Sequence, residues 1–263
     1  MTRAPAPPGS RAVYDTGSFV RYGVAFAAMS AALAYLAWRH GGWAWLLIWP
    51  AVSFAIVAAG YLRLGPRVMG KTHVGDFSWW SRVLLLPFRL FVLFGWYVGR
   101  AITPGPASAE IMPGVWLGRR VSASELPPGT GIVIDLTSEI AVPRRVRDET
   151  RRYICLPTLD RGVPDVTAAR AALNQAAQVA REGGGVYIHC AQGFGRSAAL
   201  VAAMLIRRGE SRDVDDAEAR LKTLRPGVRL TRQQRAFVTE LTATPDAPPP
   251  PSPTSAAGAA EKT

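Results

Sequence analysis

The chain has 263 residues, a mean hydropathy of +0.10 and a formal net charge of +12 at pH 7. Apolar residues crowd its first hundred positions, which excludes a single uniform soluble domain and indicates two parts. With only Cys155 and Cys190, the chain cannot carry the disulfide framework of small secreted domains, and this usage fits a reducing cytoplasm.

Two apolar segments near the start, residues 19–38 and 43–62, are each about long enough to cross a bilayer. A four-residue turn separates them, so we expect a transmembrane helical hairpin. Buried helices of a soluble bundle are disfavoured, because nothing nearby would cover two helices that are apolar all round. Basic residues flank the outer ends, with Lys71 after the second span, whereas Arg39 stands alone in the turn. This bias predicts a multi-pass membrane protein with both ends of the hairpin on the cytoplasmic side.

A third apolar run covers residues 83–98. It is shorter, it contains Pro87, and Arg82, Arg89 and Arg100 recur along it. These features favour a helix that lies in the interface or is docked on the hairpin. A third span is the alternative, and it would carry everything downstream to the opposite side of the membrane.

The positive charge is concentrated near the hairpin. Residues 1–109 hold ten basic and two acidic residues, a net +8, whereas residues 110–242 hold twenty and fifteen, a net +5. We therefore expect anionic lipid headgroups as partners, and we expect no nucleic-acid partner because no stacking platform or binding motif is evident. The three histidines are far apart in sequence, so no metal cofactor is expected.

Five parts are predicted along the chain. Residues 103–108 contain two prolines and a glycine and are interpreted as a linker, after which short strand-like runs alternate with helical ones. The parts are a cytoplasmic segment (1–18), the transmembrane hairpin (19–62), a basic juxtamembrane region with the third apolar helix and the linker (63–109), a catalytic domain (110–242) and a disordered Pro/Ala-rich tail (243–263).

The catalytic domain is predicted to be an α/β sheet flanked by helices, preceded by the all-α hairpin. Thr167 is a plausible N-cap for its first helix. The strands are expected at 115–117, 131–136, 152–156 and 186–190, and the helices at 167–182, from 197 onwards, at 213–224 and at 231–241.

The stretch 186–206 has the pattern of a buried strand, a tight loop and an apolar helix. Backbone amides of such a loop turn inward, and the positive end of the helix dipole points at the same place, which makes a pocket for a phosphate dianion. Within it, the thiolate of Cys190 is the candidate nucleophile, the fork of Arg196 can hold two phosphoryl oxygens, and Ser197 can donate to the sulfur. The candidate phosphate-binding residues are Ala191, Gln192, Gly193, Phe194, Gly195 and Arg196.

These residues, HCAQGFGRS, resemble the Cys-x5-Arg-Ser/Thr signature loop of the protein tyrosine phosphatase superfamily. The flanking text, LPTLDRGVP before the loop and EARLKTLRPGVRLTRQQRAFV after it, resembles the dual-specificity branch, and the likeness runs from about residue 111 to 241. It implies a dual-specificity-phosphatase-like sheet and hydrolysis of phosphomonoesters through a phosphocysteine intermediate, without a cofactor.

The resemblance also implies a general acid on the loop after an earlier strand. Asp160 stands thirty positions before Cys190 and matches that place, and Asp165 is its rival. By the same resemblance, His189 supports the loop by hydrogen bonding. Asp135 is expected to fix loop geometry. Cys155 is interpreted as a core residue, with reversible disulfide formation to Cys190 as the alternative.

Two substrate classes are open at this stage. The resemblance favours a dual-specificity protein phosphatase acting on phosphotyrosine, phosphoserine or phosphothreonine. A phospholipid phosphatase is the alternative, because part of the text also resembles the phosphatidylglycerophosphate phosphatase type. Ala191, Gln192 and Phe194 supply no lysine, which disfavours a multiply phosphorylated inositol headgroup. A non-enzymatic, membrane-tethered pseudophosphatase is disfavoured, because all the catalytic candidates are present.

Overall fold

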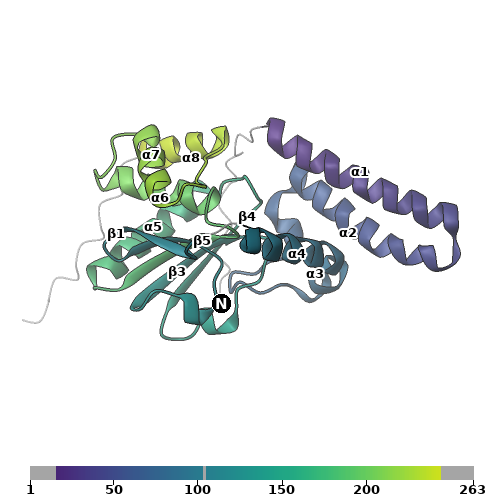
Figure 1. Cartoon of the computed structure of the whole chain (residues 1–263), viewed down its shortest axis with the longest axis horizontal. Helices are drawn as coiled ribbons and strands as arrows, with labels where there is room; N and C mark the ends of the chain where they lie inside the picture. The colour runs from purple at the N-terminus through teal and green to yellow at the C-terminus, as the bar shows by residue number, and fades with distance from the viewer. Residues whose placement is uncertain (1–15, 103–104, 244–263) are drawn as a thin grey trace, which may run out of the picture.

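The computed structural model describes residues 16–102 and 105–243 of the chain (Figure 1). Helix α1 (Thr16–His40) forms the first arm of a hairpin and ends where Gly41 and Gly42 take positive φ angles of 60° and 50°. Glycine adopts such angles without the steric cost that a Cβ brings, so the chain reverses within two residues. The second arm is a series of helical pieces: η1 (Gly42–Leu47), α2 (Ile48–Ala59), η2 (Gly60–Leu64) and η3 (Gly65–Met69).

Both arms have the length and hydropathy of helices that can cross a membrane, over Phe19–His40 and Gly42–Met69. They pack on each other through aromatic contacts such as the stacked rings of Phe26 and Phe54, whose centroids lie 5.9 Å apart. Most of their apolar surface faces outward. In the most apolar 18-residue stretch of each arm, only 11% of the first arm and 39% of the second arm are buried. Large side chains that are exposed on the hairpin include Val24, Tyr35, Trp38, Trp43, Trp45 and Leu46.

The third apolar run forms two helices, α3 (Trp79–Leu84) and α4 (Leu86–Ile102). Pro87 lies in the first turn of α4, where a missing N–H costs nothing, so α4 continues for 17 residues beyond the break at Leu85. Buried Phe88 packs edge-on against Phe54 of α2 at 6.2 Å, so α4 is docked on the hairpin.

Five strands form one mixed sheet in the order β1-β2-β5-β3-β4. β1 pairs antiparallel with β2, and all the other pairs are parallel. The parallel strands therefore end at one edge, where β5 and β3 bring their carboxyl ends side by side. The strands are β1 (Ser108–Met112), β2 (Val115–Arg119), β3 (Thr130–Thr137), β4 (Arg152–Thr158) and β5 (Gly185–Cys190).

One face of this sheet is covered by four helices (Figure 1), and they share a core with Ile134 of β3 and Ile188 of β5. The other face carries Val133 and Tyr187 and is covered by loop residues such as Val142. The predicted α/β sheet with flanking helices is confirmed. The helices are α5 (Val166–Arg181), α6 (Arg196–Arg207), α7 (Val214–Leu224) and α8 (Arg232–Ala243), and two short turns, η4 (Ala123–Glu125) and η5 (Arg144–Val146), lie in loops.

Two local predictions were wrong. Ser108, expected in the linker, is instead the first residue of the edge strand β1. This strand has only five residues, too few for an alternation of apolar and polar residues to be recognised in the sequence. Thr167 is not the N-cap of α5, because Asp165 holds that place and its side chain accepts a hydrogen bond from the Ala168 backbone N–H. The expected segment 1–18 lies outside the described residues except for its last three, and the expected tail 243–263 except for residue 243.

Candidate active site

Cys190 lies at the carboxyl end of β5, at the bottom of the loop that leads into α6. Its side chain is buried, and its Sγ accepts hydrogen bonds from the Gly193 backbone N–H at 3.2 Å and the Ser197 hydroxyl at 3.3 Å. α6 begins at Arg196, so the positive end of its dipole lies at the same loop. Donors and dipole together stabilise negative charge on the sulfur and on any anion placed above it.

The two loop glycines have different roles. Gly193 has a φ of 80°, and a Cβ there would lie 2.4 Å from the Gly118 carbonyl oxygen, so both backbone angle and space require glycine. Gly195 has a φ of −126°, which other residues adopt, and a Cβ would meet the Gln234 side chain at 3.2 Å. Gly193 is therefore required for both its positive φ and its lack of a Cβ, whereas a Cβ at Gly195 would only crowd the Gln234 side chain.

Arg196 is buried and held by a carboxylate that the sequence did not point to. Its two terminal nitrogens donate to the two oxygens of Glu139, at 2.9 and 2.6 Å. The same guanidinium also donates to the backbone carbonyls of Leu136 and Thr158. Burial alone would lower the pKa of Arg196, but the Glu139 carboxylate acts in the opposite direction. The pKa of Arg196 lies above its ordinary value, so the guanidinium stays charged. The plane of the fork is thus set before any substrate binds.

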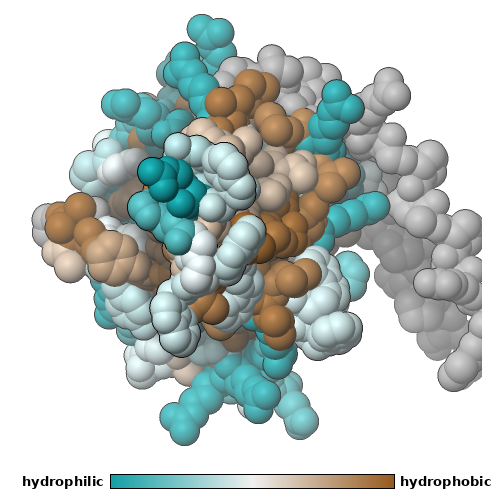
Figure 2. Space-filling view, turned by 90° about the vertical axis from the view of Figure 1, so that its right-hand side faces the viewer, coloured by the Kyte–Doolittle hydropathy of each residue, from teal (hydrophilic) through white to brown (hydrophobic). Residues whose placement is uncertain are grey.

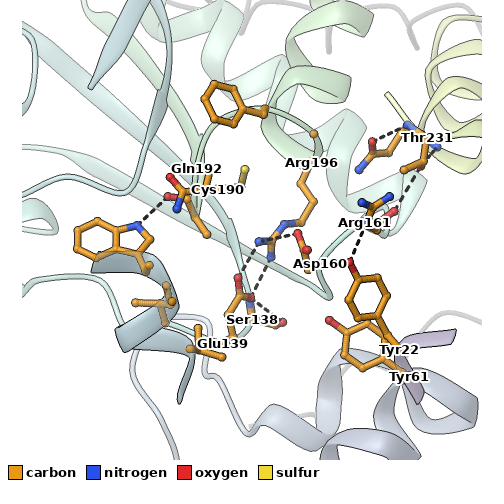
Figure 3. A pocket seen from close by; sticks show the side chains of 18 of the residues that line it. Tyr22, Tyr61, Ser138, Glu139, Asp160, Arg161, Cys190, Gln192, Arg196 and Thr231 are labelled. Carbon is orange, nitrogen blue, oxygen red and sulfur yellow. Dashed lines mark hydrogen bonds and ion pairs between the residues drawn. The ribbon is translucent and has the colours of Figure 1, made fainter. Parts of the chain in front are cut away.

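Not every donor of this guanidinium is used within the protein. The Nε of Arg196 is buried and has no hydrogen-bond partner within the described part of the chain. Arg196 and Cys190 line the same cavity (Figure 3). An unpaired buried N–H is costly unless a ligand satisfies it, and an arginine N–H selects an oxygen of an anion. The site therefore has a place for a tetrahedral oxyanion next to the sulfur.

Asp160 lies at the opening of the cavity, on the loop after β4. Its side chain is 57% exposed, and its Oδ1 lies 3.4 Å from a terminal nitrogen of Arg196 (Figure 3). An exposed carboxyl beside the anion site can exchange protons with both the ligand and water. Asp165, the rival, is occupied as the N-cap of α5 and is not among the residues that line the cavity.

Beneath the loop, Asp135 is fully buried and bound on several sides. It accepts hydrogen bonds from the Lys71 ammonium at 2.8 Å, from the Thr137 hydroxyl and backbone N–H at 2.7 Å each, and from the Tyr153 hydroxyl at 2.7 Å. Burial alone would raise the pKa of Asp135, but Lys71, His189 and Thr137 together lower it by more, so this pKa lies well below its ordinary value. Lys71, which we counted among the cations flanking the membrane, is instead completely buried.

His189 lies on the same face of the sheet, next to this network. Its Nδ1 is 3.3 Å from the Cys190 carbonyl oxygen and 3.9 Å from Asp135. Burial lowers the pKa of His189 below its ordinary value, although Asp135 acts in the opposite direction, so the ring is neutral at pH 7. The position suits support of the loop from behind, and it lies away from the cavity side of Cys190.

Cys155 is separated from Cys190 by a strand. Asp135 of β3 is the register partner of both Cys155 on β4 and His189 on β5, so these three side chains share one face, and Cys190 points to the other. Two strand spacings come to about 9.6 Å, beyond the roughly 7 Å between Cα atoms that a disulfide tolerates. Burial raises the pKa of the Cys155 thiol to about 11. The core interpretation of Cys155 is therefore favoured over a disulfide with Cys190.

Helix α4 contacts the catalytic loop directly. The indole N–H of Trp96 donates to the Ala191 carbonyl oxygen at 2.9 Å (Figure 3), and the Arg120 backbone N–H donates to the same oxygen at 3.2 Å. Fixing this carbonyl helps to turn the following amides toward the cavity. On the far side, Phe194 stacks with the Arg225 guanidinium, 5.1 Å from its ring centroid.

Sequence patterns did not indicate the contributions of Glu139, Lys71, Trp96 or the hairpin to this site. Glu139 closely follows a buried strand, and that place at the carboxyl edge of a parallel sheet is the one signal that would have suggested it. The cavity has a volume of 550 Å³. Its lining includes further residues of the catalytic domain, such as Glu139, Leu230 and Gln234. The hairpin and α4 contribute Tyr22, Phe26, Tyr61, Met69, Phe88, Val92, Gly95 and Trp96.

In a comparison with known protein families, residues 115–243 match the dual specificity phosphatase catalytic domain. No curated protein matches the sequence. Among solved structures, Tk-PTP in the active form is 24% identical, with a TM-score of 0.48, and the match covers 53% of this chain and 99% of that one. PTPMT1 is 22% identical, with a TM-score of 0.44, and the match covers 52% of this chain and 96% of that one. The human tyrosine phosphatase-like serine/threonine/tyrosine-interacting protein is 24% identical, with a TM-score of 0.46, and the match covers 53% of this chain and 97% of that one.

Proposed function

Residues 115–243 belong to the dual-specificity phosphatase branch of the protein tyrosine phosphatase superfamily, and the chain is therefore a cysteine-based phosphatase of phosphomonoesters. From this premise we propose that Cys190, Arg196, Asp160 and Ser197 carry the reaction and that the hairpin holds the enzyme in a membrane. The observation that supports these roles most directly is the meeting of one buried sulfur, its two donors and the unpaired Nε of Arg196 in a single cavity.

In the first step the Cys190 thiolate attacks phosphorus and forms an S–P bond while the P–O bond to the leaving group breaks. Asp160 gives its proton to the departing oxygen, so a neutral alcohol or phenol leaves. The loop amides and the Nε of Arg196 bind the equatorial oxygens, where negative charge is spread in the transition state.

In the second step the Asp160 carboxylate takes a proton from a water molecule that attacks the same phosphorus. The S–P bond breaks, inorganic phosphate is released and the Cys190 thiolate returns. The Ser197 hydroxyl, 3.3 Å from Sγ, stabilises the sulfur as it leaves. Asp160 ends the cycle protonated, ready for the next substrate.

Membrane anchoring by the hairpin is proposed from the outward-facing apolar side chains of both arms. A large exposed apolar surface of this kind is unfavourable in water and is stabilised in a bilayer. Arg63 and Arg67, both exposed near the end of the second arm, fit anionic headgroups on the cytoplasmic side. The catalytic domain would then act on phosphomonoesters at that surface, and both substrate classes, phosphorylated side chains and lipid phosphates, meet the loop through the same dianion.

Turnover of a generic aryl phosphate by the full chain in detergent or nanodiscs tests the reaction. Cys190→Ser should abolish turnover, since a hydroxyl is a far weaker nucleophile than a thiolate. Cys155→Ser is the matched control and should keep activity within a fewfold of wild type. Absence of wild-type turnover, or equal rates in the Cys190→Ser protein, would overturn the proposal.

A further inference from the structure

The cavity above Cys190 continues beyond the space that a phosphate occupies. Its volume of 550 Å³ falls within the range of about 300–1,000 Å³ that small-molecule sites occupy. The polar end is formed by Cys190, Arg196 and Asp160. The other end is built by parts of the chain that lie outside the family match, which begins at residue 115.

The walls of this second end are mainly apolar, apart from the hydroxyl groups of Tyr22 and Tyr61. Phe26 and Tyr61 come from the two arms of the hairpin, and Phe88 and Val92 come from α4. The Phe26 ring lies 5.6 Å from that of Tyr61 and 5.7 Å from that of Phe88, so the three form one continuous surface. Gly95, one turn along α4 from Val92, leaves room beside them, because a Cβ there would meet no other heavy atom within 4 Å.

The hairpin is fixed against the loop that carries Asp160. Leu159 is buried in the same cluster as Phe19, Phe54 and Phe88, and the Arg161 Nε donates to the Tyr22 hydroxyl at 3.1 Å (Figure 3). The apolar wall therefore has a defined position relative to the anion site, and Tyr22 marks the boundary between the two ends.

The apolar end includes residues of both segments that are expected to lie in the membrane. Phe26 belongs to the first candidate span and Tyr61 to the second. Figure 2, which looks onto the hairpin end of the molecule, shows hydrophobic side chains gathered on that face. The phosphate site at Arg196 and the side chains of Phe26 and Val92 line the same cavity, so a ligand bound there can contact both.

We infer that this apolar end is a binding site for the hydrocarbon chain of the substrate, so that the enzyme acts on lipid phosphomonoesters whose chain lies between α1 and α4. This inference rests on the proposed function, because it takes the phosphate to be bound at Cys190 and Arg196. A phosphorylated side chain of a protein would leave the half-buried side chains of Phe26 and Val92 without a ligand contact.

Straight-chain alkyl phosphates test the site without assuming a headgroup. The full chain in nanodiscs is assayed for phosphate release from butyl and decyl phosphate, both below their critical micelle concentrations, with a soluble aryl phosphate alongside. Each buried methylene can add up to about fourfold in kcat/KM. We expect decyl phosphate to exceed butyl phosphate by at least about tenfold.

Gly95→Leu fills the apolar end, and Val92→Trp fills it from the same helix. Either should reduce the decyl-to-butyl ratio to within about threefold of one. Ala101→Leu adds the same side chain at an exposed position near the end of α4, outside the cavity, and should leave the ratio unchanged. Binding of butyl and decyl phosphate to the Cys190→Ser protein is measured by tryptophan fluorescence. The ratio of the two affinities gives the same comparison without turnover.

Three outcomes separate the two proposals. No turnover of any phosphate overturns the proposed function, and the binding comparison still decides on the chain site. Turnover of the aryl phosphate with equal rates for butyl and decyl phosphate overturns the chain site alone and points to a phosphoprotein. A large ratio that persists in both Gly95→Leu and Val92→Trp would show partitioning into the nanodisc and would also overturn the site.

Discussion

The guanidinium of Arg196 and the carboxylate of Glu139 form two parallel hydrogen bonds, at 2.9 and 2.6 Å, in the interior of the catalytic domain. The pair fixes the orientation of the guanidinium, whose Nε has no hydrogen-bond partner among the described residues. Burial alone would raise the pKa of Glu139, but Arg196 lowers it more, so the carboxylate stays ionised throughout the neutral range. Glu139 is thus a positioning residue that acts through Arg196.

Glu139→Gln should weaken both the site and the fold. The amide keeps one acceptor but removes the charge, and breaking a buried pair costs about 3 kcal/mol. We expect kcat/KM for an aryl phosphate to fall about tenfold to a hundredfold, with a lower melting temperature. Glu240→Gln, at an exposed position on α8, is the control for both measurements. Full activity of Glu139→Gln would mean that the backbone carbonyls alone orient Arg196.

The Lys71–Asp135 pair predicts acid sensitivity. The pKa of folded Asp135 lies below its unfolded value of about 3.9, so the stabilisation is complete above that pH and is lost as the pH falls further. Lys71→Met leaves the carboxylate without its buried partner, should destabilise the fold by about 3–5 kcal/mol at neutral pH, and should shift the loss of stability to higher pH.

Thermal unfolding between pH 3 and 8 measures both effects. The control is Lys222→Met, because the Lys222 side chain is half exposed and its partner Glu218 keeps the Leu230 N–H and Arg235 as donors, so we expect a much smaller loss of stability. Equal melting temperatures for Lys71→Met and wild type at pH 7 would contradict a stabilising role for the pair.

Gly193 and Gly195 should respond differently to alanine. Gly193→Ala combines a positive φ with a contact of 2.4 Å to a backbone oxygen, so the loop must move and the donor to Cys190 is displaced. We expect a loss of kcat/KM of at least about a hundredfold, the order found for removal of one oxyanion donor. Gly195→Ala needs only a small shift of Gln234 and should stay within about tenfold of wild type. Similar losses in both variants would refute this distinction.

Trp96 connects α4 to the catalytic loop through one hydrogen bond to Ala191. Trp96→Phe keeps a large aromatic ring but removes the donor, and we expect a roughly tenfold decrease in kcat with little change in melting temperature. Trp79→Phe serves as control, since the Trp79 side chain is 81% exposed. If kcat is unchanged in Trp96→Phe, the Arg120 amide alone suffices to hold the Ala191 carbonyl.

Contacts between residues that are close in sequence could be predicted, whereas contacts between residues far apart in sequence could not. Cys190, Gly193 and Arg196 lie within one loop whose spacing determines its geometry, so their meeting was predictable. Glu139 reaches Arg196 across 57 positions and Trp96 reaches Ala191 across 95. No local periodicity encodes such contacts.

Lys71 shows how the same residue type can mislead. After an apolar segment, a lysine is typical of a membrane flank, and only the tertiary fold places this one against Asp135. The hairpin was likewise predicted as an anchor, and its part in the cavity follows from packing of Leu159 against Phe19, which neither segment reveals alone.

The last prediction separates Asp160 from Asp165. Asp160→Asn removes the proton donor to the leaving oxygen, and general acids contribute about 10²–10⁴-fold to rate. The loss of kcat should be larger for an alkyl phosphate than for an aryl phosphate, because a poor leaving group depends more on protonation, while KM changes little. Asp165→Asn should keep kcat and lower only stability, since an asparagine side chain can still cap α5. A large, leaving-group-dependent loss in Asp165→Asn with none in Asp160→Asn would reverse the assignment.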